Sequence, residues 1–525
     1  MICRQNPNNV ARSSRWALPL LALTTIIQVA RGQEFRYFEK VVVAEPTKLD
    51  WVYPLRGTSP PTTPPELAKE TERGGRFSYE FYGPVDNDSA GRALVIFVSP
   101  QDRPVGWDFW AETCETHGAM FAGVRDAGNG VSEARRMRAV LETLSDVQRR
   151  HGGSIERTYL AGFSGGAHIA WRVACALPEQ FGGVVCIGYA PQPPRSAWQR
   201  MRLAERLSVA IVSGDRDPAT PWIEALESPK FQEYGVRTAV KVLARHGHTM
   251  PQAEVMEEAF EWMEQASDVR AADVKRRIGL NRVGSTREEW STSFLNDAQG
   301  RLKFPDSTAT GLTTLAEIVQ RWPDLPAASE AQKLLEENEK RADKSWLADE
   351  QRQAAKLLRI EAAGYERLAR QNEPTLRGQR AALTAQAKQR WEQLALSEDA
   401  KLQMEAKVRL AELEKWAARA PTGEAKQAAM PLGKVRFELV GEVTLAEGIE
   451  RFQNVLAQLG YALQIDEGAV PIIAAGGERR IKLDLPAATY NDIDRWFFRR
   501  NGLKLVRKGN AIELKPAESK TEAAH

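Results

Sequence analysis

The sequence predicts an α/β fold, in which a mostly parallel sheet has helices on both faces, followed by an α-helical region and a small α+β domain. Three observations lead to this prediction. Short apolar runs alternate with amphipathic helices from about residue 35 to 268, the pattern of a parallel sheet covered on both sides. From about residue 270 the composition shifts to Ala, Glu, Lys, Gln, Arg and Leu, and from about residue 433 two strand–helix–strand patterns follow.

The predicted sheet begins with two rather polar runs, "YFEKVVVAE" and "RFSYEFYG", which we expect to be antiparallel strands at one edge. The next run, "ALVIFVSP" (93–100), is apolar throughout, as is typical of a strand buried on both faces. Five further strands are predicted in "AMFAGVRD", "IERTYLAGF", "GGVVCIGYA", "LSVAIVSGD" and "TAVKVLARH". Helices are predicted in "GWDFWAETCETHG", "VSEARRMRAVLETLSDVQRRH", "GGAHIAWRVACAL" and "QAEVMEEAFEWMEQ". The second helix has one apolar stripe, formed by Met137, Val140, Leu141, Leu144 and Val147.

The region from residue 271 to 428 is predicted to be helical. Its segment "LTTLAEIVQRWPDLPAASEAQKLLEENEKR" (312–341) predicts two helices separated at Pro323 and resembles one tetratricopeptide-type hairpin. A single hairpin of this type cannot bury its apolar face alone. A further helical stripe is formed by Leu383, Ala387, Trp391 and Leu394. A helical bundle, a short coiled coil and a solvated spacer all fit this composition, and we favour a loose bundle.

The C-terminal domain is predicted to contain two diverged copies of a strand–helix–strand unit. Each helix opens with a capping-box pattern, at Thr444-x-x-Glu447 and at Thr489-x-x-Asp492. A hairpin through residues 508–510 ends the second copy. The pattern resembles the secretin and TonB short N-terminal (STN-like) modules of bacterial envelope proteins. This resemblance implies a docking role toward an envelope protein partner and brings no catalytic residue.

The N-terminus predicts a secretory signal peptide. Arg4, Arg12 and Arg15 precede "WALPLLALTTIIQVA", and Ala30 and Gly32 are small residues at the −3 and −1 positions of a cleavage site. An uncleaved anchor is the alternative, but the apolar stretch is shorter than the ~20 residues that a spanning helix needs. We therefore expect export to the periplasm or out of the cell. The predicted parts are a signal peptide, an α/β domain, a helical region, an STN-like domain and a disordered tail, at residues 1–32, 33–270, 271–428, 429–515 and 516–525.

Charge and cysteine content exclude several classes of function. Loss of residues 1–32 removes four arginines and no acidic residue, which lowers the formal net charge from +3 to −1. No basicity then remains to indicate a nucleic-acid partner. Cys114, Cys175 and Cys186 are odd in number and irregularly spaced, which fits neither a disulfide framework nor a zinc site. One bridge between Cys175 and Cys186 is an alternative to three buried thiols, which we favour. We expect no metal and no cofactor.

The stretch "YLAGFSGGAHIA" (159–170) contains a G-x-S-x-G motif between a predicted strand and a predicted helix. A sharp strand-to-helix turn leaves no room for side chains beside a nucleophile. We therefore predict Ser164 as the nucleophile and Gly162 and Gly166 as the glycines of the nucleophile elbow. The Gly165 N–H, at the helix N-terminus, is predicted to face an oxyanion. A glycine-rich structural turn is the alternative.

A nucleophilic serine needs a base, and the base needs an orienting acid. In hydrolases whose nucleophile occupies such a strand-to-helix turn, the chain order is serine, acid, histidine. Asp217 follows the strand "LSVAIVSG" and is the predicted acid, with Asp215 as the rival. His248 follows the last strand and is the predicted base, with His246 as the rival that we expect to bond locally. We expect His168 to be a helix surface residue.

The chain from about residue 80 to 265 resembles an α/β-hydrolase. The stretch "RTYLAGFSGGAHIAWRVACALPEQFGGVVCIGYAP" is similar to exported esterases related to polyhydroxybutyrate depolymerases and feruloyl esterases. One departure concerns the loop after the third strand, where such relatives carry His-Gly and supply the second oxyanion amide. Here the loop is "SPQDRP", and Pro100 has no N–H to donate. We expect the Gln101 N–H to serve instead.

The resemblance implies an exported serine hydrolase that cleaves small or polymeric carboxylic esters through an acyl-enzyme. Two alternatives stay open at this point. One is an envelope interaction protein with a weak or inactive hydrolase-like domain, and the other is a serine peptidase, because the same three residues can cleave amides. The short segment between "GYAP" and "LSVAIV" predicts an open site without a large lid. Trp198 and Trp222 are candidates to line that site, and simple packing of the indole rings is the alternative.

Overall fold

The computed structural model describes residues 35–49, 70, 75–84, 91–194, 196–266, 286–341, 344–371, 376, 378–419, 437–458, 462–476, 481–508 and 511–517. The predicted signal peptide lies outside these residues, as do residues 518–525 of the predicted tail, whereas Pro516 of that tail ends a strand. The chain forms two compact units, which divide between Ala354 and Ala355. No described helix is both long enough and apolar enough to cross a membrane.

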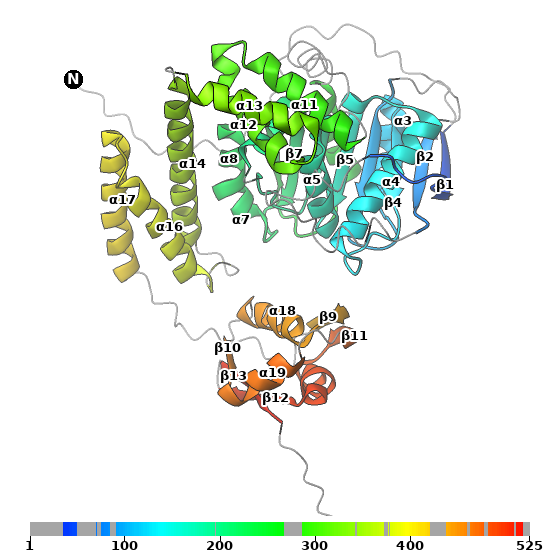
Figure 1. The fold of residues 1–525 in the computed structure, drawn as a ribbon. Coiled ribbons are helices and arrows are strands. Elements are labelled where there is room, and N and C mark those ends of the chain that lie inside the picture. The colour runs from blue at the N-terminus through cyan, green and yellow to red at the C-terminus, as the bar shows by residue number, and fades with distance from the viewer. Residues whose placement is uncertain are drawn as a thin grey trace, which may run out of the picture. The chain divides into compact units, whose positions relative to one another are not determined.

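The first unit is built around an eight-stranded sheet with the order β1-β2-β4-β3-β5-β6-β7-β8 (Figure 1). β1 and β2 pair antiparallel at one edge, β2 pairs antiparallel with β4, and all other neighbours are parallel. The antiparallel edge and the parallel remainder confirm the predicted fold class. The strands are β1 (Phe35–Val42), β2 (Ser78–Pro84), β3 (Leu94–Val98), β4 (Met120–Val124), β5 (Thr158–Phe163), β6 (Gly183–Ile187), β7 (Ser208–Gly214) and β8 (Arg237–Leu243).

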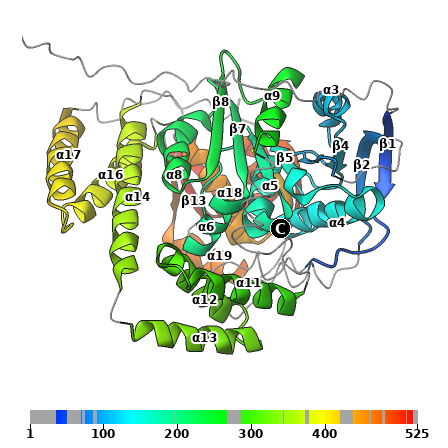
Figure 2. The same ribbon diagram turned by 90° about the horizontal axis from the view of Figure 1, so that it is seen from above.

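Helices cover both faces of this sheet. Figure 2 shows α3 (Trp107–His117) and α9 (Ala253–Glu264) on one face, with α4 (Glu133–His151), α5 (Gly165–Ala176) and α6 (Ala197–Arg206) on the other. Successive side chains of a strand point to opposite faces. Accordingly, Ile96 and Val98 of β3 join the core beside α4 and α5, whereas Val95 and Phe97 join the core beside α3 and α9. The apolar run "ALVIFVSP" is thus buried on both sides.

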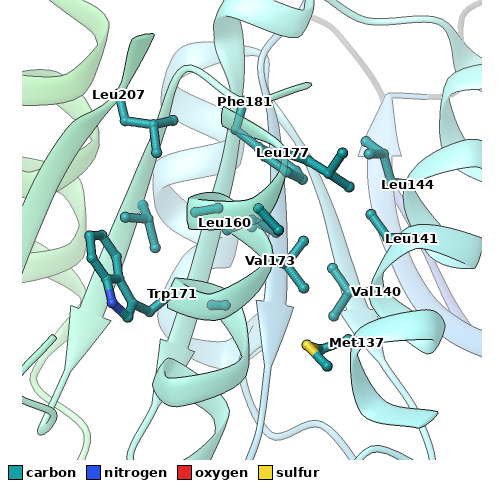
Figure 3. Close-up of a cluster of buried hydrophobic side chains, with 14 of the residues drawn as sticks. Met137, Val140, Leu141, Leu144, Leu160, Trp171, Val173, Leu177, Phe181 and Leu207 are labelled. Carbon is teal, nitrogen blue, oxygen red and sulfur yellow. The ribbon is translucent and has the colours of Figure 1, made fainter. Parts of the chain in front are cut away.

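The predicted apolar stripe of α4 packs between this helix and the sheet. Figure 3 shows side chains of α4 facing Leu160 of β5 and Val173 and Leu177 of α5. All members of the stripe are at most 2% exposed: Met137, Val140, Leu141, Leu144 and Val147. Cys114, Cys175 and Cys186 are free thiols, and burial raises the pKa of each. Cys114 and Cys186 are buried and Cys175 is partly buried, so the prediction of buried thiols is confirmed for two of the three, and the alternative bridge between Cys175 and Cys186 is not formed.

Three helices beyond residue 270 share the core of the sheet domain. They are α11 (Arg287–Arg301), α12 (Thr308–Arg321) and α13 (Pro326–Glu339), and they lie outside α6 in Figure 2. Trp290, Phe294 and Trp322 pack with Trp198 of α6 in the same buried cluster as the sheet. The hairpin predicted at residues 312–341 therefore buries its apolar face against α11 and α6. The compact unit that contains the sheet extends past the predicted boundary at residue 270.

Polar contacts also join these helices to α6. Arg301 of α11 forms a two-pronged ion pair with Glu205, at 2.7 and 2.8 Å. The Ser196 hydroxyl, which caps α6, donates to Glu317 of α12 at 2.8 Å. Arg202 of α6 stacks over Trp198, 4.0 Å from the ring centroid. Apolar and polar contacts together make α11–α13 part of the sheet domain rather than a separate region.

The second unit begins within α14 (Ser345–Arg370) and contains the rest of that helix, two further long helices and the C-terminal domain. α14, α16 (Arg380–Leu394) and α17 (Ala400–Arg419) share a small apolar cluster that includes the predicted residues Ala387, Trp391 and Leu394. This packing fits the helical bundle that the sequence favours. β9 (Phe437–Val443), α18 (Leu445–Gln458) and β10 (Ala462–Ile465) follow in the order of the first predicted strand–helix–strand copy.

The second copy begins with β11 (Ile481–Ala488) and α20 (Tyr490–Ile493) and ends with β12 (Leu503–Lys508) and β13 (Ala511–Pro516). Thr489 and Asp492 form the predicted capping box. β12 and β13 pair antiparallel from Lys508 opposite Ala511, as the predicted hairpin requires. The strands form two sheets, with the orders β10-β13-β12 and β11-β9.

Candidate active site

Ser164 occupies the sharp turn between β5 and α5. β5 ends at Phe163 and α5 begins at Gly165, as predicted. The backbone of Ser164 has φ 53° and ψ −122°, and its N–H donates to Ile187 O at 2.8 Å. A positive φ is uncommon for a residue other than glycine and clusters at functional sites. The turn therefore holds this serine in a conformation that local preference alone does not favour.

The predicted glycines of the elbow are required by close backbone approaches. A Cβ at Gly162 would lie 2.6 Å from Ala167 N and from Gly166 C. A Cβ at Gly166 would overlap the Val98 carbonyl oxygen at the end of β3. Any larger residue at either position would push α5 away from the sheet. The local sequence thus fixes the start of α5 beside the ends of β3 and β5.

Ser164, His248 and Asp217 are brought together although they lie far apart in the sequence. His248 Nε2 is 2.9 Å from Ser164 Oγ, and His248 Nδ1 is 2.8 Å from Asp217 Oδ2. The Asp217 carboxylate can only accept, so Nδ1 carries the proton and Nε2 is left to accept the Ser164 hydroxyl proton. The second carboxylate oxygen of Asp217 accepts the Ala219 N–H at 2.9 Å. This arrangement can remove a proton from Ser164.

The two rivals in the sequence have other partners. Asp215 accepts the Arg245 N–H through Oδ2 at 2.8 Å, which fixes the turn after β8. His246 Nε2 lies 3.1 Å from the backbone carbonyl oxygen of Thr249 and 3.1 Å from its hydroxyl oxygen. The His246 carbonyl oxygen accepts the Arg216 N–H at 3.0 Å. The prediction of local bonding for His246 is confirmed. These contacts join the loop after β7 to the loop after β8.

The imidazole of His248 packs against Phe163 and Gly188, which were not among the predicted site residues. The Phe163 ring lies 5.0 Å from the imidazole, centroid to centroid. Gly188 follows β6 with φ 60°, and a Cβ there would lie 3.1 Å from the His248 ring. Phe163 and Gly188 therefore set the plane in which the imidazole lies. A glycine directly after a buried strand was the only signal for the second of these.

The loop after β3 differs from a ready oxyanion site. Pro100 has no N–H, and the Gln101 N–H donates to Ser99 Oγ at 3.1 Å. Donation from Gln101 to a substrate oxyanion would require that bond to break. The Gly165 N–H is at the first position of α5, where helix N–H groups have no intrahelical acceptor. Gly165 thus lies where the sequence predicts, and the role of Gln101 stays a prediction.

His168, one turn after Ser164, takes part in a polar cluster. His168 Nδ1 lies 2.9 Å from the Tyr189 hydroxyl, and its Nε2 bonds to Glu133 at the start of α4. Arg172 donates to the same carboxylate at 2.6 Å. The His168 hydrogen bond lowers the pKa of Glu133, and burial opposes this shift. His168 is partly exposed, as predicted, but it also ties α5 to α4.

One expectation about the tryptophans was wrong. Trp198 is 1% exposed and packs 5.0 Å from the Phe294 ring, centroid to centroid. It belongs to the contact between α6 and α11 and cannot line an open site. Its burial follows from the docking of α11–α13, which the composition predicts to be a separate region. Trp222 is partly buried at the end of the short helix α7 (Thr220–Trp222).

One group of side chains in the described part of the chain has metal-ligand chemistry. Ligand atoms of His117 on α3 and of Glu257 and Glu261 on α9 lie within 4.8 Å of one another. His117 Nε2 is 3.6 Å from Glu257 and 3.9 Å from Glu261. These are also the contacts of an ion pair between a protonated histidine and two carboxylates. We assign the group to the packing of α3 on α9.

No family model matches the sequence, and no curated protein matches it. Similar solved structures include Est1E from Butyrivibrio proteoclasticus, at 14% identity over 37% of this chain and 96% of that chain, with a TM-score of 0.28. An S-formylglutathione hydrolase from Agrobacterium tumefaciens is similar at 11% identity over 36% of this chain and 90% of that chain, with a TM-score of 0.28. The Bacillus cereus carboxylesterase is similar at 19% identity over 38% and 99%, with a TM-score of 0.30. The mostly parallel eight-stranded sheet with helices on both faces is the α/β-hydrolase fold class that the sequence predicts.

Proposed function

We propose that this protein is a serine hydrolase that cleaves carboxylic esters through a covalent acyl-enzyme. The observation that carries the proposal is the pair of hydrogen bonds at His248, 2.9 Å to Ser164 Oγ and 2.8 Å to Asp217 Oδ2. A serine hydroxyl is a weak nucleophile until a base takes its proton, and the base works best when an acid orients it. The uncommon backbone conformation of Ser164 adds support, because such conformations cluster at functional sites.

In the proposed reaction, Ser164 Oγ forms a bond to the ester carbonyl carbon while His248 Nε2 takes the hydroxyl proton. The carbonyl electron pair moves onto oxygen, and the Gly165 N–H stabilises the resulting oxyanion. The bond to the leaving alkoxide then breaks as His248 returns the proton to it. Water repeats the sequence on the acyl-enzyme and releases the acid. Asp217 stays ionised and holds the imidazole.

Esters are favoured over amides by the loop after β3. Pro100 offers no N–H and the Gln101 N–H is bonded to Ser99, so backbone stabilisation of the oxyanion is weaker than two free amides would give. Esters are more reactive acyl donors than amides and need less such stabilisation. The resemblance of residues 157–191 to exported esterases supports the same choice.

A second candidate is an envelope interaction protein whose hydrolase-like domain is inactive. The loop at Pro100 and the large C-terminal portion favour it.

In addition to the esterase activity, we propose that the chain is exported and that its STN-like domain docks to an envelope protein. The strand–helix–strand order of β9–α18–β10 supports the docking proposal. A pull-down from envelope extract, with and without residues 430–525, should capture a protein only with the intact chain. Identical captures would remove the docking proposal.

Turnover by the full chain tests the proposed function. We expect release of nitrophenol from p-nitrophenyl acetate and butyrate and no comparable release of nitroaniline from peptide p-nitroanilides. Ser164→Ala should abolish the ester activity, whereas Ser293→Ala, a half-buried serine on α11, should leave it unchanged. Ester turnover that survives Ser164→Ala would overturn the assignment of the nucleophile. Faster cleavage of peptides than of esters would make the protein a peptidase.

A further inference from the structure

The loop after β4 lies against the loop after β3, beside the nucleophile elbow. The Asn129 N–H donates to Pro100 O at 2.9 Å, and the Gly128 N–H donates to Asp102 Oδ1 at 3.1 Å. The Asp126 N–H donates to Asp102 O at 2.7 Å. These three bonds hold Asn129 against the loop that contains Pro100 and Gln101. They arise from contacts between two loops at the carboxyl ends of neighbouring parallel strands.

Gly128 lets the two loops approach this closely. A Cβ at Gly128 would lie 2.7 Å from Asp102 N and 2.9 Å from Gln101 C. A side chain there would therefore push Asn129 away from the loop after β3. Asp102 is itself exposed, and its contacts with Gly128 and Asp126 set the course of the loop after β4. The backbone of Asn129 is thus positioned by its own bond to Pro100 and by the bonds of Gly128 and Asp126 to Asp102.

The side chain of Asn129 lies directly over Gly165. A Cβ at Gly165 would overlap Asn129 Oδ1 and would lie 2.8 Å from its Cγ and 3.0 Å from its Nδ2. Asn129 is exposed, so a bound substrate can reach its amide. Among the described residues, neither side-chain atom of Asn129 has a protein hydrogen-bond partner. A half turn about χ2 exchanges the oxygen and the NH₂ group, which allows the amide to present a donor beside the Gly165 N–H.

We infer that the Asn129 side-chain amide is the second donor to the oxyanion, in the place of the missing backbone amide. The inference rests on the proposed function. When Ser164 Oγ bonds to the carbonyl carbon and the proton passes to His248, the electron pair displaced onto the carbonyl oxygen accepts from the Gly165 N–H and from Asn129 Nδ2. No bond to Asn129 forms or breaks. Asn129 thus stabilises the charge that exists only in the transition state and the tetrahedral intermediate.

The test compares Asn129→Ala and Asn129→Asp with the wild-type full chain on p-nitrophenyl butyrate. Loss of one oxyanion donor typically lowers kcat by about 10²–10³-fold and leaves KM nearly unchanged. An aryl trifluoromethyl ketone, which forms a hemiketal oxyanion with the serine, should lose affinity by a similar factor. Asn129→Asp should be no better than Asn129→Ala, because a carboxylate cannot donate to an anion. The matched control Asn296→Ala, an exposed asparagine on α11, should change neither quantity.

Retention of kcat within about threefold in Asn129→Ala, with an active wild type, would overturn this inference alone, since removal of an oxyanion donor costs about 10²–10³-fold. A loss of thermal stability alone would reduce the amount of folded enzyme and hence the apparent kcat. It would not weaken the affinity of the remaining folded enzyme for the inhibitor, so the inhibitor affinity separates the two effects. A general loosening of the fold would also raise KM, which the inference excludes. An inactive wild type would instead overturn the proposed function, and this inference with it.

Discussion

Asp217 and His248 are joined by a 2.8 Å hydrogen bond whose two ends differ in exposure. The carboxylate side chain of Asp217 is 2% exposed, whereas the imidazole of His248 is 43% exposed. The buried end is fixed by the Ala219 N–H and by the turn at Gly214, and the exposed end can reach both substrate and water. The bond therefore couples a rigid anchor on the loop after β7 to a base on the loop after β8.

The first prediction concerns this anchor. Asp217→Asn should lower kcat by about 10⁴-fold, because an amide at this position favours the wrong imidazole tautomer while the geometry is retained. Asp215→Asn is the matched control two residues earlier and should lower kcat far less, since Asp215 bonds to the Arg245 N–H. Steady-state kinetics on p-nitrophenyl butyrate measure both. Equal losses in the two variants would contradict the assignment of Asp217.

The second prediction concerns the contact between Gly165 and Asn129. Gly165→Ala should lower kcat, because its methyl group would occupy the position of Asn129 Oδ1 and displace the amide. In an Asn129→Ala background the same substitution should cost much less, since the group that it displaces is already gone. A double-mutant cycle on kcat measures this coupling. Additive losses would show that the two residues act independently.

The third prediction concerns the buried carboxylate of Asp146 on α4. Burial by itself raises the pKa of Asp146, but hydrogen bonds from the Ala44 N–H, Arg150 and Tyr79 outweigh it, so that the pKa lies below its ordinary value. Arg149 bonds to the same carboxylate. The stabilisation is therefore present at neutral pH and is lost as the pH falls through the folded-state pKa, below about 4.

Asp146→Asn should accordingly lower the free energy of unfolding at pH 7 by about 1–3 kcal/mol. The difference from the wild type should shrink as the pH falls below about 4, because the unfolded-state carboxylate takes up a proton there and the folded-state carboxylate does so only at still lower pH. Urea unfolding followed by tryptophan fluorescence at both pH values measures it. A difference that stays constant between the two pH values would show that the charge of Asp146 does not stabilise the fold.

The fourth prediction concerns the contact between α6 and α11–α13. Trp322 is 1% exposed and stacks on Phe294. Trp322→Ala should therefore lower the stability of the sheet domain by about 3–5 kcal/mol. The temperature at which the proposed esterase activity is lost should fall with it. Trp496→Ala, at a tryptophan that is 44% exposed in the C-terminal domain, is the matched control and should leave that temperature unchanged.

The same contact decides where the chain can be shortened. A fragment of residues 33–341 should keep the activity, whereas a fragment of residues 33–270 would expose the face of α6 that carries Trp198. We expect the shorter fragment to be insoluble or inactive. Comparable thermal stability and turnover of the two fragments would place α11–α13 outside the sheet domain.

The fold and the polar centre of the site were predictable from the sequence for local reasons. Alternating apolar runs and helices determine the parallel sheet, and glycines mark the turn that carries Ser164. Ser164, Asp217 and His248 follow β5, β7 and β8, whose carboxyl ends lie at the same edge of the sheet. The choice of these three residues came from the nucleophile motif and the resemblance to α/β-hydrolases, whereas contact between their side chains depends on the loops after β7 and β8.

Other features depend on contacts between segments that no local pattern reveals. Asn129 reaches the elbow only because Gly128 packs on Asp102 of another loop. Trp198 is buried only because α11 docks on α6, and an exposed indole in a loop has the same sequence signature. The boundary at residue 270 follows the change in composition, but a helix of polar composition can still bury one aromatic face. These features required the three-dimensional arrangement.

Covalent labelling of the full chain with a fluorophosphonate tests the central claim most directly. The account predicts one label per molecule, located by fragmentation of the tryptic peptide 158–172 at Ser164, and no label in Ser164→Ala. Asp217→Asn should be labelled at the same position but far more slowly. A label on another serine, or an unlabelled and inactive wild-type protein, would contradict the claim that Ser164 is an activated nucleophile.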